Sequence, residues 1–369
     1  ASEDLIYIAM PDESYGFSDS DVFFVNELDG MIRYEMELDK IANLVSFYTL
    51  PADRSIENIV GEHEGNIFAV LGEGEATSYL DGQWIGTLQE FDLESGYWIR
   101  VNEPSVTLSD LGIGFDPRRE YNLNSGTNLI SYPDMGSADI STAIPDDVEE
   151  YFLGIVGEGV AASPNPVLGW VGSLTAFEGT KGYWVKTDDN FSFSFDLSEA
   201  STRESEEYSS DSPYQYSQSM NQAFYFADDI DDHGLGLSIG DWLLVYQNNV
   251  LVGARQWNGP YTDLPAMGYD GSDFTEGYML PGDIPTFKIW SSSENIYYDA
   301  IPSENVAWSA NMNAFIGSLE MITCSEETDS GCDCGQILDE CGICGGDGLT
   351  CAACTGINSI YNSSVGSSG

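Results

Sequence analysis

The sequence predicts a mainly β protein made of several small domains. We expect tandem small β-rich (α+β) repeat domains, a β-sandwich-like domain and a disulfide-rich C-terminal module. Short β-branched and aromatic runs alternate with Gly, Pro, Asn and Asp turns, as strands in small β domains do. A stretch of the N-terminal half occurs twice, and all seven cysteines lie within residues 324–354.

The internal repeat places matching motifs 85 residues apart in its first part, as at Asn43 and Asn128, and 86 residues apart from Trp84 and Trp170 onward. One residue inserted in the intervening loop explains the change. We assign repeat domain 1 to residues 41–110 and repeat domain 2 to residues 121–197, after an N-terminal β segment at residues 1–40. The repeated tryptophans are interpreted as core residues.

Each repeat also contains a predicted short helical turn between its strands. Asp53 to Ile59 and Asp139 to Ile144 fit this pattern, because an acidic residue at the start can act as the N-cap of a helix.

The polar segment at residues 199–213 is Ser- and Glu-rich and is predicted to be a linker. The β-sandwich-like domain follows at residues 214–320. The pair Asn248-Asn249 is expected to form a tight hairpin turn. The predicted strands of this domain are residues 222–226, 241–246, 250–256, 286–290 and 296–298.

The charge of the chain restricts its partners. With 62 acidic and 11 basic side chains, the formal net charge is −51. Nucleic acids and anionic membrane surfaces bind through clustered Lys and Arg, so neither is an expected partner. The sequence contains no run of 18 or more apolar residues, so membrane insertion is not expected. Because this much like charge opposes a compact state, we expect a saline or calcium-containing medium.

Calcium is the expected ligand, because hard cations prefer several oxygen ligands from short acidic loops. Two clusters are candidates, and neither reproduces a complete EF-hand loop. The alternative interpretation is a solvated acidic loop. The candidate metal ligands are Asp228, Asp229, Asp231, Asp232, Asp270, Asp273 and Glu276.

The Cys-rich module at residues 321–354 contains close cysteine pairs, which are typical of disulfides or of metal ligands. We favour disulfides in an oxidising compartment, with Cys324 left over and either free or paired between chains. The tail at residues 355–369 is flexible in composition, and Ala1 fits the new terminus that follows removal of a leader peptide. The expected disulfide-forming residues are Cys332, Cys334, Cys341, Cys344, Cys351 and Cys354.

Residues 339–348 resemble the DECGxCGGDG module of marine bacterial secreted proteins and large algal-virus proteins, and are similar to the cysteine-rich part of thrombospondin-motif metalloproteases. The repeat, through residues 128–132 and 182–185, resembles the GWNLIS…GYWV unit of bacterial and archaeal envelope proteins. Residues 252–257 and 267–271 resemble modules of the same marine surface proteins. The resemblance of the cysteine module implies an extracellular stalk or spacer, and none of these families carries catalytic residues to this chain.

We therefore expect a secreted, non-catalytic structural protein, a subunit of a cell-surface layer, stalk or filament. Its partners would be copies of itself or other surface proteins. No Gly-x-Ser-x-Gly, His-Glu-x-x-His or phosphate-loop motif is present. The first alternative is a calcium-dependent adhesin that binds glycans, with sugars stacking on Trp257, Tyr261 and Tyr269. The second is the accessory region of a secreted hydrolase.

Overall fold

The computed structural model of the protein describes residues 31–103, 106–113, 116–198, 200, 212–234 and 237–322. It contains 49% strand and 7% helix, which confirms a mainly β protein. The described chain divides into two compact units. The first holds both repeats together with Ser217–Gln222 and Gly268–Thr275, and the second holds Tyr214–Tyr216, Ala223–Met267 and the chain from Glu276 onward.

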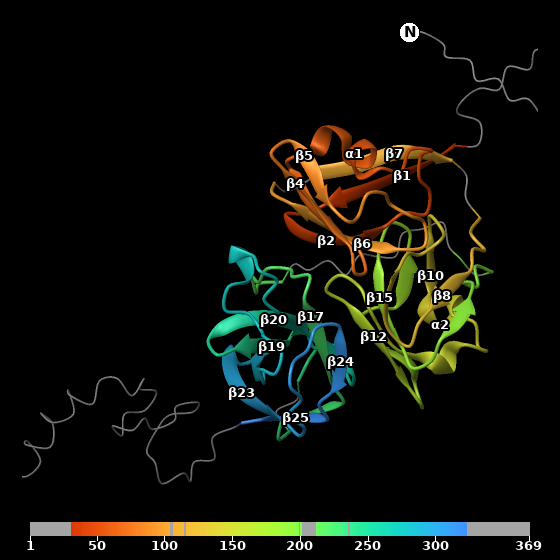
Figure 1. Ribbon diagram of the computed structural model, residues 1–369. Coiled ribbons are helices and arrows are strands. Elements are labelled where there is room, and N and C mark those ends of the chain that lie inside the picture. Colours follow the sequence, from red (N-terminus) through yellow and green to blue (C-terminus); the bar gives the residue numbers. More distant parts are fainter. Residues whose placement is uncertain are drawn as a thin grey trace, which may run out of the picture. The chain divides into compact units, whose positions relative to one another are not determined.

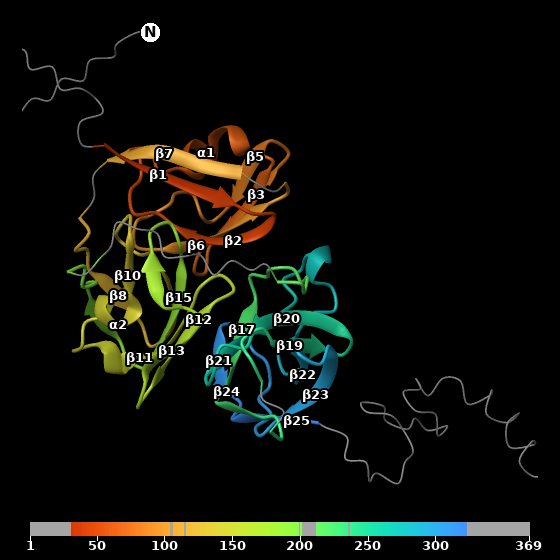
Figure 2. The ribbon, with the colours of Figure 1, turned by 180° about the vertical axis from the view of Figure 1, so that it is seen from behind.

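The first repeat is built on a five-stranded sheet with the order β2-β6-β3-β4-β5. Figure 1 labels four of its strands, β2, β6, β4 and β5. A separate antiparallel pair, β1 and β7, runs beside it (Figure 2). This pairing joins residues 31–38 to the first repeat. The elements are β1 (Met31–Leu38), β2 (Ile41–Ser46), α1 (Ile56–Val60), the 3₁₀ helix η1 (Gly61–His63), β3 (Ile67–Leu71), β4 (Ala76–Leu80), β5 (Gln83–Gly86), β6 (Gly96–Val101) and β7 (Val106–Ile113).

The second repeat has the same sheet, in which each strand is the counterpart of one in the first: β9-β15-β11-β12-β13. Short pairs β8 with β16 and β10 with β14 complete it. The elements are β8 (Tyr121–Leu123), β9 (Gly126–Ile130), β10 (Ser137–Asp139), α2 (Ile140–Ala143), η2 (Glu149–Tyr151), β11 (Phe152–Val156), β12 (Ala161–Asn165), β13 (Gly169–Gly172), β14 (Ala176–Glu178), β15 (Tyr183–Thr187) and β16 (Phe191–Phe193).

The repeats agree in detail as well as in topology. The indole of Trp84 donates to Glu64 at 3.0 Å, and the indole of its counterpart Trp170 donates to Glu149 at 2.6 Å. The register shift at Ile67 in β3 recurs at Phe152 in β11. We call two residues counterparts when the repeat offset relates them.

Both predicted helical turns are present, but the cap of the first was assigned to the wrong residue. Helix α1 begins at Ile56, and its N-cap is Ser55, whose Oγ accepts from the backbone N–H of Asn58 at 3.3 Å. The carboxylate of Asp53 instead accepts from the N–H of Ser55 at 3.1 Å, because Asp53 lies two residues before the N-cap position. Asp139 is the N-cap of α2, without a side-chain cap bond.

The second unit contains a six-stranded sheet, β18-β25-β23-β22-β19-β20, and a three-stranded sheet, β21-β17-β24. The hairpin predicted at Asn248-Asn249 is confirmed, since Gln247 pairs with Val250 and Asn248 has φ of 53°. Strands β17–β24 and β18–β25 are parallel pairs. The elements are β17 (Gln222–Ala227), β18 (Asp229–Asp231), β19 (Trp242–Gln247), β20 (Val250–Gln256), β21 (Thr262–Met267), η3 (Asp273–Thr275, in the first unit), β22 (Thr286–Ser291), β23 (Ile296–Pro302), β24 (Met312–Phe315) and β25 (Ser318–Met321).

Each repeat has its own apolar core. Phe47, Phe91 and Tyr97 pack with edge-to-face and tilted geometry in the first repeat. Phe177 and Phe195 do so with their neighbours in the second. A small third cluster is shared by the repeats: Ala42, Leu44, Trp98 and Leu129, with Trp184 and Met220 partly buried against it. The second unit has a separate core.

Candidate functional site: the interface between the repeats

The two repeats contact each other through reciprocal hydrogen bonds. The N–H of Ser46 in the first repeat donates to Thr180 O at 2.8 Å. Its counterpart Ser131 donates to Glu94 O, the counterpart of Thr180, at 3.0 Å. Each repeat thus offers the other the same donor and the same acceptor, as the two halves of an isologous dimer interface do.

Two glutamates complete the exchange. Glu158 of the second repeat accepts from the N–H of Leu44 at 2.8 Å, and Glu73 of the first accepts from the N–H of Leu129 at 2.9 Å. Strands β2 and β9, which carry Leu44 and Leu129, end their sheets at the interface. An edge strand has backbone N–H groups without a ladder partner, and these carboxylates supply one.

The environment of Glu158 disfavours its charged form. Burial raises the pKa of this carboxyl, while nearby Lys181 and the Leu44 N–H lower it and Asp39 raises it further. The net effect is a raised pKa. The interface therefore contains a carboxyl group that takes up a proton more readily than an exposed one.

Two glycines allow the repeats to approach closely. A Cβ at Gly182 would lie 2.7 Å from Val45 O, and one at its counterpart Gly96 would lie 2.9 Å from Ile130 O. Real Cβ atoms do not come this near to a carbonyl oxygen, so glycine is required for this approach. Trp98, only 3% exposed, fills the shared apolar cluster next to these contacts.

A cavity of about 250 Å³ lies beside the interface in the first unit. Three glutamates, Glu73, Glu94 and Glu120, are part of its wall, so a cationic or amide-bearing group suits it better than an anion. Asn128, in the same wall, has its side chain bonded to the backbone of Asn124. The remaining lining residues are Ser95, Tyr121, Asn122, Leu123, Asn124, Leu129 and Ile130.

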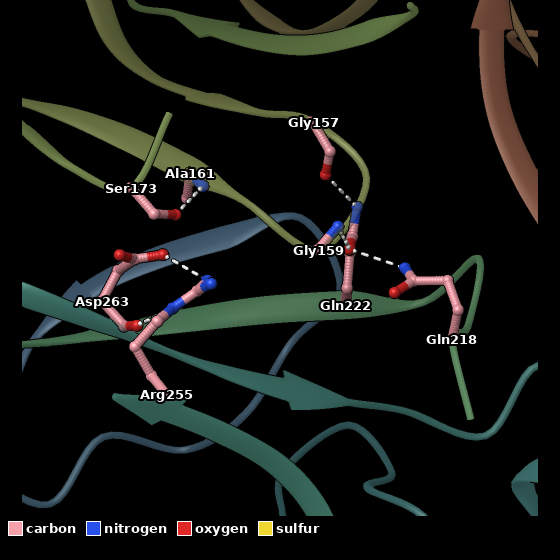
Figure 3. Close-up of polar contacts among 8 residues, drawn as sticks. All are labelled: Gly157, Gly159, Ala161, Ser173, Gln218, Gln222, Arg255 and Asp263. Atoms are coloured by element: carbon pink, nitrogen blue, oxygen red, sulfur yellow. Dashed lines mark hydrogen bonds and ion pairs between the residues drawn. The ribbon is translucent and has the colours of Figure 1, made fainter. Parts of the chain in front are cut away.

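The loop that carries Glu158 is held by a glutamine of the same unit. The side chain of Gln222 donates to Gly157 O at 2.7 Å and accepts from the N–H of Gly159 at 3.1 Å (Figure 3). Gln218 donates to the same Gln222 oxygen at 3.1 Å. Both glycines flank Glu158, so Gln222 fixes the loop from which that carboxylate reaches Leu44.

The first predicted calcium cluster begins at Asp228, just before β18, and continues through the strand to Asp232; three of its four carboxylates accept from nearby backbone N–H groups. Asp232 accepts from Gly234 and Leu237, both at 2.8 Å. Asp231 accepts from His233 at 3.2 Å, and Asp229 accepts from Ile230 at 2.8 Å. Burial, with Glu304 adding to the effect, raises the pKa of Asp228.

In the second predicted cluster, Asp270 organises a turn. Its Oδ1 accepts from the hydroxyl groups of Ser272 and Thr275, both at 2.7 Å. Burial raises the pKa of this carboxyl, but these hydrogen bonds outweigh burial and the pKa is lowered. Asp273 begins η3, while Glu276 belongs to the second unit. Within the described part of the chain, no three His, Cys, Asp or Glu side chains converge as a metal site would require.

The predicted sugar-stacking residues differ in their surroundings. Trp257 packs partly buried against the core of the second unit. Tyr261, in the same unit, meets Phe315 edge to face at 6.3 Å between centroids. Tyr269 is 44% exposed in the first unit. The six cysteines predicted to form disulfides lie outside the described residues, as does Cys324.

Comparison of the chain with protein-family models, curated proteins and solved structures gives no match. Among the described helices, none has the length and apolar character needed to cross a membrane. Sequence reasoning found the repeat but missed the interface residues Glu73, Glu158, Gly96 and Gly182. The signal that marks them is their recurrence at the repeat offset, in positions that otherwise read as ordinary turn residues.

Proposed function

We propose that this chain is a non-catalytic extracellular structural protein, a subunit of a cell-surface layer, stalk or filament. In this role the two repeats act as one stiff spacer. The observation that supports it best is the reciprocal interface, where hydrogen bonds, close glycine contacts and a shared apolar cluster fasten the repeats to each other. Two domains connected by a flexible hinge would not require contacts of this kind.

The outer sheet edges supply a means of assembly. Strands β5 and β13 end the two five-stranded sheets on the side away from β2 and β9. Exposed apolar side chains accompany both, with Ile85 57% exposed in β5 and Val167 86% exposed in the turn before β13. An open edge is a template for pairing with another strand, so one spacer offers two related edges to neighbouring copies.

The second unit and the Cys-rich module have the same structural role as the repeats. The second unit is a two-sheet β-sandwich, with a shared core that includes Leu243, Leu264 and Ile289. The Cys-rich module is a disulfide-bonded base. Because the net charge of −51 keeps copies apart, assembly requires salt or divalent cations to screen it.

Electron microscopy of the full chain, with sedimentation, tests the proposal across salt and calcium concentrations. We expect regular fibres or sheets once the charge is screened. The variant Ile85→Lys places a charge on the β5 edge and should prevent them. Leu280→Lys is the matched control, since Leu280 is 52% exposed and lies outside any described strand. Dispersed monomers under all conditions, or hydrolysis of a glycan by the chain, would refute the proposal.

A further inference from the structure

The two glutamate loops of the interface have the same backbone but different surroundings. In the second repeat, Gly157 N–H donates to Val160 O at 2.9 Å, and in the first, Gly72 N–H donates to Glu75 O at 2.8 Å. The φ angles of Gly159 and Gly74 are 68° and 74°. The carbonyl and amide groups that Gln222 binds in the second repeat are therefore present in the same conformation in the first.

Only one of the two loops is covered. Gly157 is buried next to Gln222, whereas Glu73, Gly74 and Glu75 are exposed. Within the described residues, the structure records no hydrogen bond to Gly72 O or from Gly74 N–H, the counterparts of the two groups that Gln222 occupies. The first repeat thus has a preformed amide-binding loop in which the place of Gln222 is not taken by any described side chain.

The charge around this loop indicates what would bind there. Glu73 joins the loop to the 250 Å³ cavity, whose wall also includes Glu94 and Glu120. The two terminal segments outside the described core, residues 1–30 and 323–369, contain acidic residues and no Lys or Arg, and the internal segment 201–211 has one Arg against four acidic residues. Like-charge repulsion disfavours these segments as occupants, and a cationic segment of another protein is complementary.

We propose that the Gly72–Glu75 loop and the adjoining cavity bind an extended peptide segment of a partner protein, one that carries a glutamine flanked by lysine or arginine. The glutamine amide bonds to Gly72 O and Gly74 N–H as Gln222 does to the second repeat. The cationic side chain enters the acidic cavity. This inference is independent of the proposed function, because it depends only on the comparison of the two loops.

A synthetic peptide tests the site on the intact chain. The probe is Lys-Lys-Ser-Gln-Ser-Met-Asn-Gln-Lys, which copies Ser217–Gln222 and adds lysines, with a fluorescent label for anisotropy. We expect saturable binding at one site. Replacing the last glutamine of the probe by leucine removes two hydrogen bonds and should weaken binding about 30-fold.

Variants of the chain test the charge. Glu94→Gln with Glu120→Gln should weaken binding of the probe about 10-fold and reduce its salt dependence. The matched control, Glu62→Gln with Glu150→Gln, removes two exposed glutamates outside the cavity wall and should leave binding unchanged.

Amide hydrogen exchange locates the bound probe. Protection of the Gly74 amide on binding supports the proposal. Three results would each overturn it. The first is protection at Gly159 with release of Ser217–Gln222, the second is equal binding of the leucine probe, and the third is no binding of the glutamine probe at millimolar concentration.

Discussion

Alanine at Gly182 is the sharpest test of the repeat interface. The added Cβ would lie 2.7 Å from Val45 O and 3.2 Å from Leu44 Cδ1, so the two repeats have to move apart. Overpacking of this kind costs about 1–3 kcal/mol. The lower chain entropy of alanine in the unfolded state offsets about 0.4–1 kcal/mol of that. A net loss of about 0.5–2 kcal/mol at the interface is expected.

Amide hydrogen exchange measures this loss at the interface itself. The N–H groups of Leu44 and Ser46 bond across it, to Glu158 and Thr180. A local opening that is favoured by about 0.5–2 kcal/mol speeds their exchange by ~2–30-fold. Gly72→Ala is the control, because its Cβ would meet the Tyr97 ring at an ordinary 3.5 Å. Wild-type exchange at Leu44 and Ser46 in a folded Gly182→Ala protein would refute the reasoning.

Four further predictions concern the pKa of Glu158, a buried ion pair, the cysteines and calcium. Burial raises the pKa of Glu158, so the native state keeps this proton to higher pH than the unfolded chain does and loses stability as the pH rises through the folded pKa. The melting temperature of Glu158→Gln should therefore rise relative to that of the wild type between pH 4 and pH 7. A difference in melting temperature that does not change with pH would contradict this. Arg255 and Asp263 form a buried ion pair at 2.9 Å, with side chains 8% and 2% exposed (Figure 3), so Arg255→Met should cost about 3–5 kcal/mol in denaturant unfolding of the second unit. Lys288→Met, which breaks the exposed pair with Asp299, should cost at most about 1 kcal/mol, and equal costs would count against the argument. Thiol titration of the denatured chain should find one free thiol among the seven cysteines, whereas seven would argue against an oxidising compartment. Chelation should lower the melting temperature where calcium binds the acidic loops, and an unchanged value removes calcium as a ligand.

Much of the fold was predictable because its signals are local. The alternation of β-branched runs and turns located β17, β19, β20 and β22, and the repeat offset gave the second repeat the topology of the first. Strands β18, β21, β24 and β25 were missed. Strands β18, β24 and β25 have three or four residues each, and the pairs β17–β24 and β18–β25 are parallel, so no hairpin turn joins the strands of either pair.

The interface was not predictable, because its residues act across the two repeats. Glu73 and Gly74 resemble any acidic turn in a chain with 62 acidic residues. Gly96 looks like a strand boundary, and only the position of Ile130 O explains why a side chain is excluded there. The N-cap of α1 was missed for a similar reason, since Asp53 and Ser55 are both good capping residues and only the backbone geometry decides between them.

Dilution of the protein affects the two repeats differently from two subunits that meet through the same kind of surface. Two separate domains that meet through such a surface dissociate when their concentration falls below the dissociation constant. Here both halves lie on one chain, joined through residues 114–120, and the effective concentration of each at the other is set by that short connection. The pairing of the repeats is therefore the same at nanomolar as at millimolar protein concentration.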